Sequence, residues 1–401
     1  YGIFNGELAY NAANKKEEIL MKRTMKKMVS MALTGTMAVA VLAGAGTSEV
    51  KAADKAKIGV LVADVSGEEA QGFRSYYENY IAGNYDVEFN YTDALQSAED
   101  EKTAIEKFAS QGCQAIISFS SNDRVQQIET CEKYGVYYAV ASGVLDDAQY
   151  ETYKTYEYFA GQVGPGNDTE FEAGKDMGAY YKEQGVSKVA IYGAFIPNPM
   201  HVYRVAGVLN GLGCTYGGES DMNAIAGQIF QDQTVDLSKV EGDVEVVSYL
   251  QGYGDTTTDE LNAAIQKTPD AFISVGMATT FFAQSLSEAG ISFSDIDSFT
   301  ETNGNSMKNG TLTYLAGKYS SSIGPVFALV MNAINGNVIR DEDGNAPSIS
   351  QGYLVATDSD TFDKYSVSDS GDAPIYDKET LDSIIGDNVT FEDVKTLVES
   401  K

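Results

Sequence analysis

Polar side chains follow several apolar runs of the chain, and their types suit hydrogen bonding to a small polar ligand. Six such residues lie just past these runs: Asp64, Ser66, Ser120, Asn122, Asp123 and Ser142. Carboxylate, hydroxyl and amide groups supply the fixed donors and acceptors that a ligand-binding cleft needs. The same residue types are also favoured helix caps, so capping stays open as an alternative role, for Asp64 and Asp123 in particular.

The sequence offers little for catalysis, for a metal or for a cofactor. His201 is the only histidine, and no CxxC, HExxH, GxSxG or Walker-type phosphate loop occurs. No nucleophile is visibly paired with a base, so we expect a binding protein rather than an enzyme. The three cysteines, Cys113, Cys131 and Cys214, cannot all pair, and we expect buried free thiols.

The elements that must position the polar residues alternate along the chain. Short β-type runs are separated by helical patterns, with strands expected at 57–64, 86–91, 114–120, 136–142, 188–195, 244–250, 270–276 and 296–300. This alternation predicts βαβ units and parallel sheets, with ligand-contacting loops at the carboxyl ends of the strands. A Gly-rich break at 159–166 divides the pattern into two halves, which predicts two lobes with a cleft between them.

The segment before the first strand has the features of a secretory signal. A basic stretch at 21–27 leads into residues 29–46, which carry no charge, and small residues follow at the exit. We therefore expect a signal peptide at 21–52, cut after Ala52 or, as the second choice, after Ala45, and a secreted or periplasmic protein. An uncleaved membrane anchor and a buried helix are the alternatives. Ala45 stands where a lipoprotein would have its lipidated cysteine, so a lipid tether is expected only if the native residue is Cys.

Residues 1–20 precede that signal and need a separate explanation. The run Lys16-Glu17-Glu18 lies just before Met21, and its codons can contain a purine-rich ribosome-binding sequence. We therefore expect residues 1–20 to be translated leader and Met21 to be the native start. A gene without such a purine run before the Met21 codon would contradict this interpretation.

The charge balance excludes one class of partner. The chain carries 58 Asp and Glu against 28 Lys and Arg, a net charge of −30 at pH 7. Such an acidic surface repels phosphate backbones, so we expect no nucleic-acid partner.

Four segments resemble a known family. They are KIGVLVADVSG (57–67), AIISFSSNDRVQQIETCEKYGV (115–136), HVYRVAGVLNGL (201–212) and PDAFISVGMATTFFAQSLSEAG (269–290). With them the chain resembles type I periplasmic substrate-binding proteins, the sugar-binding class attached to ABC importers, which share their fold with lactose-repressor-type effector domains. The third segment fits the family's R-x-x-G-F-x-x-x-L element, with Val208 in place of Phe.

The resemblance implies an α/β fold of two doubly wound parallel-sheet lobes joined by a three-segment hinge. By analogy, residues 55–158 plus 318–352 form the N-terminal lobe, and residues 159–317 plus 353–401 form the C-terminal lobe. It also implies a monomer that captures a small ligand, a sugar or sugar-like molecule, in the cleft and delivers it to the permease of an ABC importer. A sensory protein for a membrane receptor, and a binder of nucleosides or signal molecules, remain alternatives.

The resemblance also supplies candidates in the second lobe. Arg204 matches the family arginine that reaches the ligand, and a guanidinium suits bidentate contact; a surface salt bridge is the alternative. His201 lies on the same helical face, and Tyr253 offers a stacking ring. Three further candidates occupy positions where the family carries polar contacts: Met277, Glu301 and Tyr319. The departures at these positions predict a site less polar than a typical pentose or hexose site.

Overall fold

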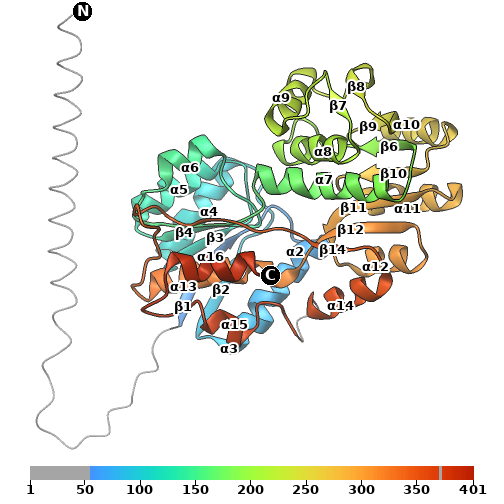
Figure 1. Cartoon of the computed structure of the whole chain (residues 1–401). Helices are drawn as coiled ribbons and strands as arrows, with labels where there is room; N and C mark the ends of the chain where they lie inside the picture. Colours follow the sequence, from blue (N-terminus) through green and yellow to red (C-terminus); the bar gives the residue numbers. More distant parts are fainter. Residues whose placement is uncertain (1–54, 370–372) are drawn as a thin grey trace, which may run out of the picture. The chain divides into compact units, whose positions relative to one another are not determined.

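The computed structural model describes residues 55–369 and 373–401 (Figure 1). The predicted leader and signal peptide lie outside the described residues. Within the described residues, no helix is both long enough and apolar enough to cross a lipid bilayer.

The first lobe is built on a six-stranded sheet. Its strand order is β13 (Ser348–Ser350), β5 (Phe159–Gly164), β4 (Tyr137–Ala141), β3 (Ala115–Ser118), β1 (Ala56–Leu61) and β2 (Val87–Tyr91). Every neighbouring pair is parallel. The helices along this part of the chain are α2 (Glu68–Ser75), η1 (Tyr76–Ile81), α3 (Ala82–Asn84), α4 (Ala98–Ser110), α5 (Arg124–Tyr134), α6 (Asp147–Tyr153), η3 (Ser320–Ile323) and α13 (Gly324–Ile334).

Both faces of this sheet are covered, which explains why its central strands are continuous apolar runs. Ile116 packs in a cluster with Ile105 of α4 and Ile128 of α5. Its neighbour Ile117 belongs to the cluster that contains Val326 of α13. Parallel strands buried on both faces lack the alternation of a half-exposed strand.

The second lobe repeats this plan. Its strand order is β14 (Leu354–Ala356), β12 (Leu312–Lys318), β11 (Ser292–Ser298), β10 (Ala271–Ser274), β6 (Lys188–Tyr192) and β9 (Glu245–Leu250). Only β14 is antiparallel to its neighbour. Its helices are α7 (Asn167–Glu183), α8 (Pro199–Gly211), α9 (Met222–Asp232), α10 (Asp255–Gln266), α11 (Ala278–Ala289), α12 (Glu301–Lys308) and α14 (Ser359–Asp369), with the short elements β7 (Thr215–Tyr216), η2 (Leu237–Lys239) and β8 (Val240–Glu241).

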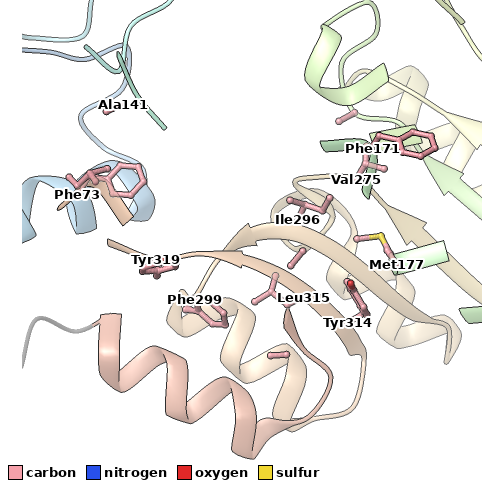
Figure 2. Close-up of a cluster of buried hydrophobic side chains, with 14 of the residues drawn as sticks. Phe73, Ala141, Phe171, Met177, Val275, Ile296, Phe299, Tyr314, Leu315 and Tyr319 are labelled. Carbon is pink, nitrogen blue, oxygen red and sulfur yellow. The ribbon is translucent and has the colours of Figure 1, made fainter. Parts of the chain in front are cut away.

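Helices α7 and α8 pack unusually closely in the second lobe. A Cβ on Gly174 of α7 would lie 2.0 Å from the carbonyl oxygen of Arg204 of α8. A Cβ on Gly207 of α8 would lie 2.0 Å from the carbonyl oxygen of Phe171 of α7. Only glycine permits such backbone contact. Figure 2 shows part of the buried apolar cluster on which these helices pack. It includes Met177 of α7, Ile296 of β11 and Leu315 of β12.

The chain crosses between the sheets at three places, which confirms the predicted two-lobe parallel fold. The crossings follow β5, β12 and β13. The structure puts β5 in the first sheet, so the second lobe begins after Gly164 and not at residue 159 as expected. The Gly-rich segment is a buried strand in which Gly161 lets the carbonyl oxygen of Pro347 approach and accept from the amide of Gln162 at 2.8 Å.

The C-terminal segment divides between the lobes, whereas we expected all of 353–401 in the second lobe. Strand β14 and helix α14 contact the second lobe, as expected. Helices α15 (Lys378–Asp382) and α16 (Phe391–Glu399) instead contact α13 and β13 of the first lobe. Their buried apolar side chains explain this docking: Tyr376, Leu381, Ile384, Val394 and Val398. This burial depends on tertiary partners that the polar-looking tail does not reveal.

Candidate functional site

A large cavity runs along the carboxyl ends of the first sheet and is faced by the second lobe. Its volume is about 1150 Å³. The first-lobe wall includes residues that follow four different strands, among them Asp64, Tyr91, Phe119 and Ser142. The carboxyl edge of a parallel sheet is where α/β proteins bind ligands, so this cavity is the candidate site.

Aromatic rings form part of the first-lobe wall. Phe73 of α2 stacks on Phe119, with ring centroids 5.3 Å apart. The guanidinium of Arg74 lies 4.6 Å from the centre of the Tyr91 ring. All four side chains line the cavity. Such rings offer apolar faces to the C–H groups of a ligand, and the sequence analysis named none of the four.

Arg124 brings a positive charge to the cavity wall. It is the first residue of α5, and its Nη1 donates to the carbonyl oxygen of Val144 at 2.6 Å. Its Nε is buried and has no hydrogen-bond partner. Burial lowers the pKa of Arg124, and no ion pair with it is found within the described part of the chain. A half-buried guanidinium that has an unpartnered Nε and no carboxylate beside it favours a ligand that supplies acceptors.

Two of the predicted residues of the first lobe line the cavity, Asp64 and Ser142. The carboxylate of Asp64 also organises its own loop, because it accepts from the amides of Ser66 at 2.9 Å and Gly67 at 3.0 Å. The Ser66 amide bond is the main cause that lowers the pKa of Asp64. Ser66 itself is not part of the lining.

Three other predicted residues support the site from outside the cavity lining. Ser120 donates to the buried carboxylate of Glu101, and the amides of Asn122 and Asp123 donate to it at 2.9 Å each. The side chain of Asp123 caps α5 by accepting from the amide of Gln126 at 2.9 Å. The capping alternative therefore describes Asp123, and Glu101 is the residue that the sequence analysis missed.

Arg204, with 3% of its surface exposed, is not part of the cavity lining, although its ion-pair partner Glu170 is. Its Nε donates to Glu170 at 2.6 Å, its Nη1 to the carbonyl oxygen of Val275 at 2.9 Å, and its Nη2 to the hydroxyl of Tyr353 at 2.7 Å. All three nitrogens are engaged, two by partners in the second lobe and one by Tyr353, which lies between β13 and β14. The structure thus gives Arg204 a buried ion pair rather than the surface salt bridge that was the alternative, and its ligand contact stays a prediction.

His201 is buried beside Phe195 and does not line the cavity. Its Nδ1 lies 3.1 Å from both the amide nitrogen and the carbonyl oxygen of Phe195. Burial lowers the pKa of His201 to about 4, and the charge of Arg204 adds to the effect. His201 is therefore a neutral, structural side chain at neutral pH.

The remaining predicted residues also lie outside the cavity lining. Tyr253 is 69% exposed and stacks on Phe281, with ring centroids 5.9 Å apart. Met277 precedes α11 in a left-handed conformation, and Glu301 begins α12. Tyr319 is buried and stacks on Tyr376 of the C-terminal segment.

The second lobe contributes residues that the sequence analysis did not single out for binding. They come from the amino-terminal turns of α7 and α8, from α9 and from the end of β12, and they include Asn167, Asp168, Glu170, Asn198, Met200, Tyr203, Met222, Asn223, Phe230 and Lys318. Helix α9 reaches the cavity because it packs on α8, so no local sequence pattern marks its residues as cavity-lining. Within the described residues, no three His, Cys, Asp or Glu side chains converge to hold a metal ion, and all three cysteines are buried and unpaired.

A polar contact joins the lobes beside the cavity. Glu69 of α2 accepts from the hydroxyl of Ser298 at 2.9 Å and lies 3.7 Å from the Nζ of Lys318. Ser298 and Lys318 end β11 and β12 of the second sheet. Glu69 and Lys318 also line the cavity, so this contact connects the cavity to the relative position of the lobes.

Solved structures with the same fold are numerous. An arabinose-binding periplasmic protein of an ABC transporter from Shewanella sp. ANA-3 superposes with a TM-score of 0.54 at 16% identity, covering 77% of this chain and 94% of its own. A solute-binding protein from Actinobacillus succinogenes 130z with bound D-allose gives 0.59 at 16% identity, over 78% and 100%. A Caulobacter protein bound to myo-inositol gives 0.54 at 13% identity, over 77% and 95%.

These neighbours show that the chain has the two-lobe fold of type I periplasmic binding proteins. At such low identity the likeness establishes the fold alone. No protein-family model matches the chain, and no curated protein matches it by sequence.

Arg204→Ala should destabilise the protein by about 3–5 kcal/mol, because it leaves the buried carboxylate of Glu170 without its charge partner. Urea unfolding measures the loss. As a control, the double variant Arg204→Met/Glu170→Met removes both charges and should recover a large part of it. An Arg204→Ala variant as stable as the parent protein would show that the ion pair contributes nothing.

His201 should make folding sensitive to acid. Because its pKa is lowered from 6.5 to about 4 in the folded protein, its contribution to stability is present above pH 6.5 and is lost as the pH falls toward 4. Between pH 6.5 and about pH 5 we expect a loss of about 2 kcal/mol from this residue. Urea unfolding at both pH values should show a smaller loss for His201→Gln; an identical pH dependence would contradict the assignment.

Proposed function

We propose that the protein is an extracytoplasmic solute-binding protein, which captures a sugar or sugar-like molecule in the cavity and delivers it to an ABC importer. The observation that carries the proposal is the cavity itself, which lies at the carboxyl edge of the first sheet and is faced by the second lobe. Three solved neighbours with this fold hold arabinofuranose, allose and myo-inositol, which supports the same ligand class.

The wall chemistry suits a ligand that is apolar on its faces and polar around its rim. Phe119 is partly exposed and offers a ring face to the C–H groups of a sugar, and the buried ring of Phe73 packs against it. Arg124 provides donors for hydroxyl or ring oxygens, and the exposed side chains of Asn167 and Asp168 provide donors and acceptors from the other lobe. Contacts from both lobes mean that the ligand stabilises one relative position of the lobes.

Closure of the two lobes around the ligand would then act as the signal to the importer. The Glu69–Ser298 hydrogen bond and the Glu69–Lys318 contact lie at the cavity and join the lobes. A ligand that displaces or orders Lys318 changes this contact. The proposal includes secretion by the predicted signal peptide, action as a monomer, and no enzymatic activity.

Arg124→Gln should weaken sugar binding by about tenfold or more, because a hydrogen bond to a charged donor contributes about 1.5–3 kcal/mol. The probe is the sugar that gives the largest thermal shift in a panel of pentoses, hexoses, inositols and disaccharides, and calorimetry then gives its affinity.

The matched control is Arg340→Gln. Arg340 donates to the carbonyl oxygens of Tyr156 and Glu157 at 3.0 and 3.1 Å and does not line the cavity. Its loss should leave affinity unchanged. A panel in which no sugar binds would overturn the proposed function, and unchanged binding by Arg124→Gln would remove Arg124 from the site.

A further inference from the structure

The cavity spans the full width of the first sheet. Its lining includes Tyr91 at the end of β2 and Ser350 at the end of β13. These strands are the two edges of the six-stranded sheet, so five strand spacings separate them. At about 4.8 Å per spacing, the carboxyl edge is about 24 Å wide. This length exceeds that of a single sugar ring.

The volume agrees with this length. The cavity holds about 1150 Å³, whereas pockets for drug-sized ligands hold about 300–1,000 Å³. A monosaccharide is smaller than such ligands, and it would leave much of the polar wall without a partner.

Aromatic side chains line the cavity at two separate places. The first is the Phe73–Phe119 pair of the first lobe. The second is the pair of Tyr203 and Phe230, from α8 and α9, whose ring centroids lie 6.4 Å apart. Met200 and Met222 lie in the same part of the lining.

The second sheet shows that these two places are well separated. Phe73 lines a small adjoining cavity together with Lys318, the last residue of β12. Tyr203 lies on α8, which follows β6. Strands β12 and β6 are three positions apart in the sheet order, about 14 Å. One sugar ring cannot contact both aromatic pairs across such a distance.

We infer that the cavity binds an oligosaccharide of at least two sugar units. One unit packs on Phe119, which the buried ring of Phe73 supports, and a second packs on Tyr203 and Phe230. This inference rests on the proposed function, and it separates this protein from the three solved neighbours named above, which hold single sugars or inositol.

Hydrogen-bonding groups also line the cavity and suit a chain of hydroxyl-bearing rings. Asn167 and Asp168 in the first turn of α7 are exposed and line the cavity. Asn223 of α9 accepts from the hydroxyl of Tyr203 at 3.1 Å, which fixes the orientation of that ring. The Tyr203 ring of the second aromatic pair is therefore held in one orientation by the protein itself.

Calorimetry on the purified protein tests the inference with lactose, melibiose, cellobiose and xylobiose, each beside its constituent monosaccharides. We expect at least one disaccharide to bind about tenfold or more tightly than its constituents. Tyr203→Ala should weaken that disaccharide about tenfold and leave monosaccharide affinity within about twofold, because only the second unit contacts it.

The matched control is Tyr134→Ala, which removes an exposed tyrosine of α5 outside the cavity lining and should change neither affinity. Met222→Ala serves as a second variant if Tyr203→Ala fails to fold. A monosaccharide that binds as tightly as every disaccharide containing it would overturn the inference and leave the proposed function standing. Failure of every sugar to bind would instead overturn the proposed function.

Discussion

The buried ion pair between Glu170 and Arg204 is the interaction on which the second lobe's wall of the cavity depends. Glu170 lies in the first turn of α7, directly after the first crossing between the lobes. The hydroxyl of Tyr353, which lies between β13 and β14 on the third crossing, bonds to both charged partners. Breaking a buried pair strands a charge in a low-dielectric interior, so this cluster strongly favours one arrangement of the two crossings.

The ion pair forms only because α7 and α8 approach one another backbone to backbone. At Gly174 any side chain would collide with the carbonyl oxygen of Arg204. The same approach sets the first turns of both helices beside the cavity, where they present Asn167 and Asp168 from α7 and Tyr203 from α8. Small residues in one helix interface thus place polar and aromatic groups of the candidate site.

Much of the fold could be predicted because strand and helix patterns are local. The rule that ligands meet the carboxyl ends of parallel strands correctly placed Asp64 and Ser142 at the cavity. Applied to the strand at 86–91, the same rule would also have found Tyr91. The predicted start of the second lobe at residue 159 was wrong because Gly161 and its neighbours look like a linker. They form a strand instead, and the close approach of Pro347 is what requires the glycine.

The rest of the site depends on partners distant in sequence. Arg204 has the local pattern of a ligand-binding arginine, but Glu170, 34 residues earlier, takes its guanidinium. The strand-end rule pointed to Asp123 but not to its neighbour Arg124, although both follow the third strand. The rings of Tyr203 and Phe230 meet only when α9 packs on α8, which no periodicity in the sequence indicates.

A crystal structure of the protein with its bound sugar tests the central claim most directly. The account predicts sugar density in the cavity between the lobes, with one ring against Phe73 and Phe119 and an oxygen within hydrogen-bond distance of Arg124. Sugar bound instead on the exposed rings of Tyr253 and Phe281, with the cavity occupied only by water, would contradict it.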